Sequence, residues 1–216
     1  MGAGGRARLG LRSSLGAWVV CFCLVLAGPA EGAPAVEEVV ANLQRAAGLL
    51  PADMSFRQDV QLTLFFLSWR FYSDVVRRNG EFQVATYGKP GFLSDDVPIT
   101  LLQLHTGIDA FDLELVGEET NGYGDPLYVL EGRRRVPGPG AQTGKLWVNG
   151  RTWLAEKAWL QYDWGTLEVE QEFQELEGYT VLRLQRARSS FMDSRLVVEY
   201  KNYSFGNDDT IAREDH

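Results

Sequence analysis

The chain has 216 residues, of which 45% are hydrophobic, and it carries a formal net charge of −8. This composition is typical of one large or two small folded domains. A strongly acidic surface argues against nucleic-acid binding and against electrostatic docking on anionic lipid, although solubility alone also accounts for it.

The first 32 residues have the pattern of a secretory signal peptide. A basic segment (residues 6–12) precedes an apolar core (15–27), and the small-x-small sequence 30–32 comes next. We predict cleavage after Gly32, which makes the protein periplasmic or extracellular and soluble. The apolar core is short for a bilayer span, so a retained anchor is the less favoured alternative.

Both cysteines, Cys21 and Cys23, lie in this segment. The residues before them, Val20 and Phe22, are not the small residues that a lipoprotein signal needs. Cleavage leaves 18 basic and 28 acidic residues, a formal charge of −10. We therefore predict a chain without disulfides or an acylated N-terminus, whose stability depends on its core.

The N-terminal part of the remaining chain predicts one helix and a hairpin. Apolar residues recur at helical spacing over 35–47, and Gly48 is a plausible stop. Residues 60–66 alternate as in a strand. Asn79-Gly80 between two strand-like runs predicts a two-residue hairpin. One face of that hairpin then carries Phe71, Ser73, Val75, Arg77, Phe82, Val84 and Thr86.

Residues 98–105 predict a two-turn helix, with acidic residues before it and Gly107 after it. This helix is apolar nearly all round, so it must lie on the inner face of a sheet. We predict a lid, with Leu101, Leu102 and Leu104 making the contact. His105, at its end, is interpreted as a cap or a partly buried group rather than a catalytic base.

The stretch 144–173 holds four of the six tryptophans, Trp147, Trp153, Trp159 and Trp164. Asn149-Gly150 predicts a second two-residue hairpin, in which Leu146 faces Trp153 and Val148 faces Arg151. The tryptophans are either ordinary core aromatics or cavity-lining side chains, and the sequence leaves both open.

Residues 167–173 alternate between an apolar face and an acidic one that carries Glu168, Glu170 and Glu172. We interpret the acidic face as solvated rather than as a cation site. Arg133–Arg135 are either exposed turn charges or a contact for an anionic headgroup.

Further strands are predicted over 111–116, 127–131, 159–163, 166–173, 179–186 and 195–203, followed by a polar tail, 206–216. The predicted fold is mainly β (α+β): one antiparallel sheet of about nine to eleven strands over residues 33–205. We find no G-x-S-x-G, no phosphate-binding glycine loop and no histidine pair, so we predict no enzyme, cofactor or metal.

Three segments carry a family resemblance. They are Leu127–Gly132 (LYVLEG), Lys145–Trp153 (KLWVNGRTW) and Val197–Ser204 (VVEYKNYS). In this order, after a short helix and a meander, they resemble the outer-membrane lipoprotein carrier and sorting family (LolA-like), which includes LolB-like acceptors and RseB-like sensors. The resemblance covers most of 35–205.

The resemblance implies an unclosed half-barrel around helices, with an apolar cavity for acyl chains, and transport or sensing rather than chemistry. It also implies an arginine near the mouth that holds the lid, for which Arg77 and Arg78 are candidates. We predict that the cavity is lined by Phe71, Val75, Phe82, Val84, Leu101, Leu102, Leu104, Leu146, Val148 and Trp153.

Two functional hypotheses are compatible with this resemblance. In the first, the protein is an exported carrier or chaperone for a lipid or an acylated protein. In the second, it is an RseB-like sensor with a filled core and a membrane-bound partner protein. An empty cavity favours the first hypothesis, and a filled barrel with an exposed apolar patch favours the second.

Overall fold

The computed structural model describes residues 33–93, 104 and 107–206. The predicted signal peptide, Leu101, Leu102, His105 and almost all of the polar tail lie outside these residues. Contacts within the chain divide it after Ala33, and the helix and strands of the fold belong to the unit from Pro34 onward. No helix within the described ranges is both long and apolar enough to cross a membrane.

The structure consists of one α-helix, ten strands and two short 3-10 turns over the described residues. In chain order these are α1 (Val36–Ala47), β1 (Met54–Leu64), β2 (Leu67–Arg78), β3 (Glu81–Tyr87), η1 (Ile108–Ala110), β4 (Phe111–Thr120), β5 (Pro126–Arg134), β6 (Thr143–Asn149), β7 (Ala155–Tyr162), β8 (Gly165–Leu176), β9 (Tyr179–Ser189), η2 (Phe191–Asp193) and β10 (Ser194–Phe205).

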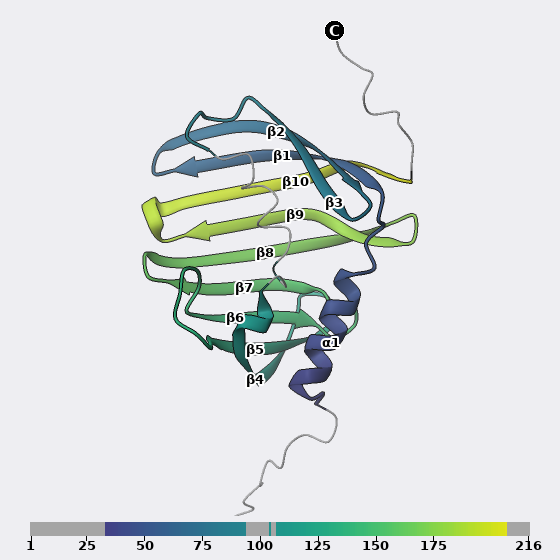
Figure 1. The fold of residues 1–216 in the computed structure, drawn as a ribbon, viewed down its shortest axis with the longest axis vertical. Coiled ribbons are helices and arrows are strands. Elements are labelled where there is room, and N and C mark those ends of the chain that lie inside the picture. The colour runs from purple at the N-terminus through teal and green to yellow at the C-terminus, as the bar shows by residue number, and fades with distance from the viewer. Residues whose placement is uncertain (1–32, 94–103, 105–106, 207–216) are drawn as a thin grey trace, which may run out of the picture. The chain divides into compact units, whose positions relative to one another are not determined.

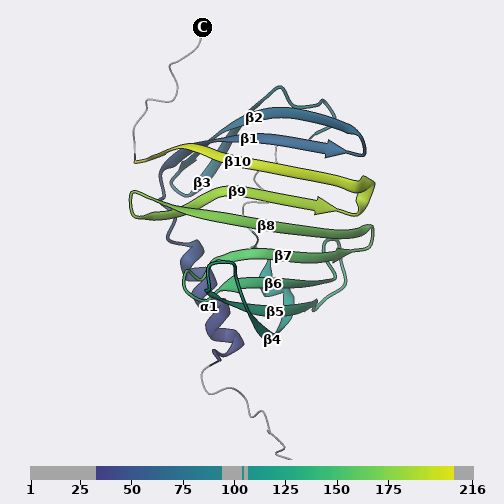
Figure 2. The same cartoon turned by 180° about the vertical axis from the view of Figure 1, so that it is seen from behind.

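All ten strands form one antiparallel sheet in the order β3-β2-β1-β10-β9-β8-β7-β6-β5-β4 (Figures 1 and 2). The two edges, β3 and β4, do not pair with each other, so the sheet is an unclosed half-barrel. The predicted mainly-β class and strand number are confirmed. The first strand of the chain, β1, pairs with the last, β10, so the two ends of the chain meet in the interior of the sheet.

Helix α1 forms where its apolar spacing predicts it. Val39 and Leu43 are buried, Glu37 and Glu38 lie in the first turn, and Arg45 lies in the last turn. Acidic residues at the N-terminus and a basic residue at the C-terminus interact favourably with the helix dipole. The helix ends at Gly48, whose backbone N–H donates to carbonyls of the last turn. Because Val39 and Leu43 lie one turn apart, a single face of α1 is buried against β4–β7.

The predicted β2–β3 hairpin is confirmed. Arg78 pairs with Glu81, and both residues of the turn, Asn79 (φ 51°) and Gly80 (φ 85°), have positive φ. Phe71, Ser73 and Val75 are buried, as the alternation predicts.

The predicted two-residue turn at Asn149-Gly150 is wrong. Val148 pairs with Ala155 and Leu146 pairs with Ala158, so residues 150–154 form a longer turn. The Asn149 side chain is the cause: its Oδ1 accepts the backbone N–H of Arg151 (2.8 Å) and of Thr152 (3.1 Å). An asparagine that bonds its own downstream backbone offers an alternative to the strand ladder.

Gly150 itself has no positive φ. It is required for space, because a Cβ there would lie 2.8 Å from Tyr128 Cε2 and 2.9 Å from Pro126 Cγ. Asn149 is fully buried, and its amide also donates to Glu156 (2.6 Å) and Asp125 (3.2 Å). A network of side chains therefore joins the ends of β5, β6 and β7.

The buried apolar residues form two clusters. The first lies on β1, β2 and β7–β10 and includes Phe56, Val60, Val75, Val169 and Val198. The second joins α1 and η1 to β5–β7 and consists of Val39, Leu43, Ile108, Leu130, Val148 and Ala155. Leu104, the one described residue of the predicted lid, packs against both.

Candidate functional site: an apolar cavity beside α1

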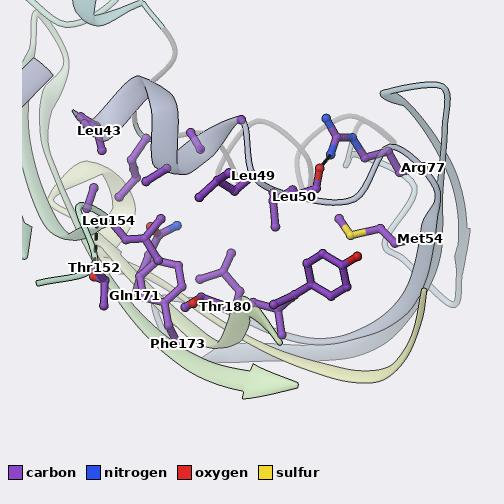
Figure 3. A pocket seen from close by; sticks show the side chains of 18 of the residues that line it. Leu43, Leu49, Leu50, Met54, Arg77, Thr152, Leu154, Gln171, Phe173 and Thr180 are labelled. Atoms are coloured by element: carbon purple, nitrogen blue, oxygen red, sulfur yellow. Dashed lines mark hydrogen bonds between the residues drawn. The ribbon is translucent and has the colours of Figure 1, made fainter. Parts of the chain in front are cut away.

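A cavity of about 520 Å³ opens at the end of the sheet where the β2–β3, β6–β7 and β8–β9 turns lie. One wall is the C-terminal half of α1 with the linker after it, and the other is the inner face of the sheet. Figure 3 shows Leu43 and Leu49 on the helix side, opposite Phe173 and Thr180. Most of the lining is apolar: Leu43, Ala46, Ala47, Leu49, Leu50, Met54, Phe56, Phe82, Leu104, Leu154, Ala155, Phe173, Val181, Leu182 and Tyr203.

Irregular strand pairing shapes this end of the sheet. The β1–β10 ladder shifts register between Ser55 and Arg57, and the β8–β9 ladder shifts between Glu172 and Phe173. A β-bulge bends its strand and re-aims side chains. Val181 and Leu182, next to the second shift, are both buried and both line the cavity.

Arg77 fixes the linker that forms the wall of the cavity. Its Nη1 donates to the carbonyl oxygens of Leu50 (2.9 Å) and Pro51 (2.8 Å), and its Nε donates to that of Gly80 (3.3 Å). The bond to Leu50 is visible in Figure 3. The guanidinium also lies 5.4 Å from the centre of the Phe82 ring. Arg77 thus holds α1's exit against the β2–β3 hairpin.

A row of polar side chains crosses the inner face of six neighbouring strands, from β3 to β8. Its members are Thr86, Ser73, Gln58, Tyr200, Gln185 and Gln171. The strand register places Ser73 opposite Thr86, Gln58 opposite both Ser73 and Tyr200, and Gln185 opposite Gln171. Between β10 and β9 the row steps by two residues, because Gln185 pairs with Val198 and is reached by the Tyr200 hydroxyl. We call this set the polar row. It reaches the cavity at Gln171, which lines it.

Most of the polar row is hydrogen-bonded within itself. Ser73 Oγ and Thr86 Oγ1 are 2.9 Å apart, and Tyr200 Oη donates to Gln185 Oε1 at 3.0 Å. Gln58 differs: it is 0% exposed, and no hydrogen bond of good geometry reaches its side-chain amide, although the Tyr200 phenol lies near enough to interact with it. An unsatisfied buried amide is costly, so Gln58 is an energetic exception within this face.

Phenol groups near the cavity are kept neutral. Burial raises the pKa of Tyr203 and of Tyr200 above the ordinary tyrosine value. Tyr203 Oη donates to the backbone carbonyl of Leu182 at 2.7 Å. These groups can therefore donate hydrogen bonds at every physiological pH, but they cannot supply a negative charge.

A second cavity, of about 280 Å³, lies over β4–β7. Leu113, Leu130, Leu146, Leu160 and Tyr162 belong to its lining. Leu104 lines both cavities. The two hollows are therefore neighbours along one inner face, on either side of that leucine.

The structure brings together some of the predicted cavity residues and separates others. Phe82 and Leu104 line the larger cavity, and Leu104 and Leu146 line the smaller one. Phe71 and Val75 are buried in the first apolar cluster, with Val84 packed on it, whereas Val148 lies in the second, with Trp153 packed on it. Arg77 lies at the cavity wall and Arg78 is exposed.

Much of the larger cavity comes from residues that the sequence did not single out. The segment 43–50, Thr152, Leu154 and the strand ends around Phe173 and Tyr203 all contribute. The helical periodicity marked Leu43, but its partner on the sheet depends on strand order. The tryptophans contribute little: Trp147 pairs with Lys157 and Trp159 with Lys145, at positions that alternate with the inward Leu146 and Ala158.

The described residues contain no group of three or more His, Cys, Asp or Glu side chains placed to hold a metal ion. Glu172 hydrogen-bonds to Arg183 and Arg186, and the acidic face of β8 is therefore matched by arginines on β9. That arrangement agrees with a solvated strand face.

An unclosed antiparallel half-barrel with a helix and an apolar cavity on its inner side defines the class as a LolA-type fold. A DUF1329 family protein from Desulfovibrio piger is 13% identical, with a TM-score of 0.58 over 85% of this chain and 96% of that one. A LolA superfamily protein from Nitrosomonas europaea is 12% identical, with a TM-score of 0.53 over 81% and 95%.

An outer membrane lipoprotein-sorting protein domain from Vibrio parahaemolyticus is 11% identical, with a TM-score of 0.54 over 83% of this chain and 95% of that one. At these identities the likeness concerns the fold, and at that level the resemblance seen in the sequence is confirmed. No protein-family model matches the chain, and no curated protein matches it by sequence.

Proposed function

We propose that the chain is an exported, non-enzymatic binding protein or chaperone that holds an acyl chain of a lipid or of an acylated protein. The observation that carries this proposal is the apolar cavity of about 520 Å³ between α1 and the sheet. Ligand cavities in proteins span roughly 300–1,000 Å³, are mostly apolar and contain a few orienting polar groups. Arg77, Thr152, Gln171 and Thr180 are such groups here.

The shape of the inner face supports an elongated ligand. The two cavities lie on either side of Leu104, and both are lined mainly by hydrocarbon. An extended acyl chain buries apolar surface along its whole length, which stabilises its complex in proportion to the area removed from water. The shared fold with a lipoprotein-sorting domain supports the same class of ligand.

Arg77 has a positioning role in this proposal. Its guanidinium is occupied by the carbonyls of Leu50 and Pro51. A guanidinium has five N–H donors in a rigid fork, so a ligand headgroup can add to these bonds at the wall. Arg78, which is exposed, stays a candidate for headgroup contact at the rim.

The test is a titration of the exported protein with a fluorescent fatty acid. Leu49 lines the cavity but is 71% exposed, so Leu49→Glu places a carboxylate at the wall with little loss of core packing. We expect saturable binding to the wild type and a roughly 10-fold weaker affinity for Leu49→Glu. Val136→Glu is the matched control, because Val136 is also 71% exposed but lies in the β5–β6 loop.

The titration also distinguishes the two hypotheses. Absence of saturable binding to the wild type would refute acyl carriage and leave the sensor with a membrane-bound partner. Equal weakening by Leu49→Glu and Val136→Glu would show that the probe does not occupy this cavity.

A further inference from the structure

Three hairpin turns at the end of the sheet away from α1 expose large apolar side chains. They are the β1–β2, β7–β8 and β9–β10 turns, which lie side by side at the left of Figure 1. Six of their residues are between 40% and 89% exposed: Phe65, Phe66, Leu67, Trp164, Phe191 and Met192. We call these six residues the apolar ridge.

The ridge is continuous across the three turns. The backbone N–H of Phe65 donates to the carbonyl of Met192 at 3.2 Å, which joins the β1–β2 and β9–β10 turns. The ring of Trp164 meets that of Phe191 edge to face at 6.0 Å, which joins the β7–β8 turn to them. Single exposed apolar residues are ordinary, but a contiguous exposed group marks an interaction surface.

The backbone shows that turn stability does not account for these residues. Phe65 (φ 51°) and Met192 (φ 57°) are in the left-handed region, which disfavours bulky side chains. The β2–β3 turn meets the same requirement with Asn79 and Gly80. At Phe65 and Met192 a large apolar side chain is therefore unfavourable both for the backbone of the turn and for hydration, which a contact that buries the side chain would offset.

We propose that the apolar ridge is a docking surface for the interfacial region of a phospholipid bilayer. Three neighbouring turns present apolar side chains from one end of the sheet (Figure 1). Phenylalanine, leucine and methionine at the tips suit the acyl boundary. The stacked pair Tyr162–Trp164, with ring centres 4.5 Å apart, suits the headgroup level. Exposed backbone groups of the turns limit insertion to this shallow depth.

Local charge is compatible with such a surface. The chain as a whole is acidic. The exposed strand positions nearest the ridge nevertheless hold Arg70, Arg188 and Arg195 as well as Glu168, with Asp163 and Asp193 in the turns, so basic and acidic side chains balance there. This end is therefore not repelled by zwitterionic or mildly anionic lipid. Tyr162 also lines the smaller cavity, so the ridge adjoins one of the two hollows of the inner face.

The test is co-sedimentation of the exported protein with vesicles made of phosphatidylcholine and a minority of phosphatidylglycerol. The N-terminus of the protein is first verified by mass. Phe66→Ser removes the most exposed ridge side chain (89%), and Tyr123→Ser removes an equally exposed ring (90%) from the β4–β5 turn. We expect a roughly 10-fold lower partition coefficient for Phe66→Ser and no change for Tyr123→Ser. The double variant Phe66→Ser/Phe191→Ser should no longer sediment with vesicles.

Two further readouts accompany the sedimentation. Trp164 emission should shift to shorter wavelength on binding, and the Trp164→Phe variant should lack that shift. Binding should persist at high salt, because burial of apolar surface rather than attraction between charges drives it. The ridge side chains lie outside both cavities, so a failure of acyl binding would leave this result unaffected.

Three outcomes would overturn the proposal. The first is a wild-type protein that does not sediment with these vesicles. The second is Phe66→Ser binding as the wild type does. The third is equal loss in Phe66→Ser and Tyr123→Ser. If the protein does not bind vesicles but binds a purified membrane protein through the apolar ridge, the surface is a docking site for a protein partner instead. Circular dichroism of each variant confirms that the fold is retained.

Discussion

The inner face of the sheet has two halves that use similar alternating strands differently. Over β4–β7, α1 covers the strands, and the buried side chains that pack with it are apolar. Over β8–β10 and β1–β3, the strands carry the polar row and border the larger cavity. A helix packed on a sheet leaves no room for unpaired polar groups, whereas strands that face a hollow can pair theirs with neighbouring strands.

The largest expected difference between the halves is the cost of truncating an apolar side chain. Leu43 is fully buried in the half under α1, so Leu43→Ala should lower the free energy of unfolding by about 2–5 kcal/mol. Phe173→Ala should cost less, about 1–2 kcal/mol, because Phe173 is only partly buried, whereas Leu43 is fully buried although both line the cavity. Urea unfolding of both variants measures this. Equal costs would mean that the cavity side is packed like a core.

The two halves also differ in what their turns require of glycine. Gly80 in the β2–β3 turn is needed for its positive φ, which asparagine tolerates, so Gly80→Asn should cost only a few tenths of a kcal/mol. Gly150 is needed for space against Tyr128 and Pro126. Gly150→Asn should therefore cost about 1–3 kcal/mol. Thermal unfolding of the pair decides this, and a tolerated Gly150→Asn would contradict the close packing of the β6–β7 turn.

In the polar row we expect smaller changes in the free energy of unfolding, of opposite sign at the two glutamines Gln58 and Gln185. Gln58→Met removes two buried polar atoms that have no hydrogen bond of good geometry, so the free energy of unfolding should rise by about 1 kcal/mol. Gln185→Met removes the acceptor of the Tyr200 hydroxyl, so it should fall by a similar amount. Denaturant titrations of the two variants measure both. A destabilised Gln58→Met would show that Gln58 is satisfied in solution, for instance by water.

The smallest expected effect is a pH dependence in each half. Hydrogen bonds from Asn149, Arg151 and Asn121 lower the pKa of Asp125, and a hydrogen bond from Arg186 lowers that of Glu172 despite partial burial. The stabilisation is therefore present above the unfolded pKa values of about 4 and is lost as the pH falls through the lowered folded values. Asp125→Asn and Glu172→Gln should each flatten the acid side of the stability profile. An unchanged profile would contradict the ionised networks.

Local chemistry was sufficient to predict much of the fold. Helical spacing and the stop at Gly48 identify α1, period-two alternation identifies β8, and Asn79-Gly80 identifies the β2–β3 hairpin. Each depends on residues within one turn or two neighbouring strands. The same dipeptide signal was wrong at Asn149-Gly150, because the asparagine side chain accepts the N–H groups of Arg151 and Thr152 and is also held by Asp125 on another part of the chain.

The sequence by itself therefore determined the class of fold, the position of most elements and the apolar face of each. The pairing of β1 with β10, the walls of the cavity, the alignment of the polar row and the assembly of the apolar ridge were decided only by the tertiary structure. These features join residues that lie up to about 150 positions apart, such as Gln58 and Tyr200. Periodicity records which face of a strand is buried, but it carries no information about which distant strand completes that face.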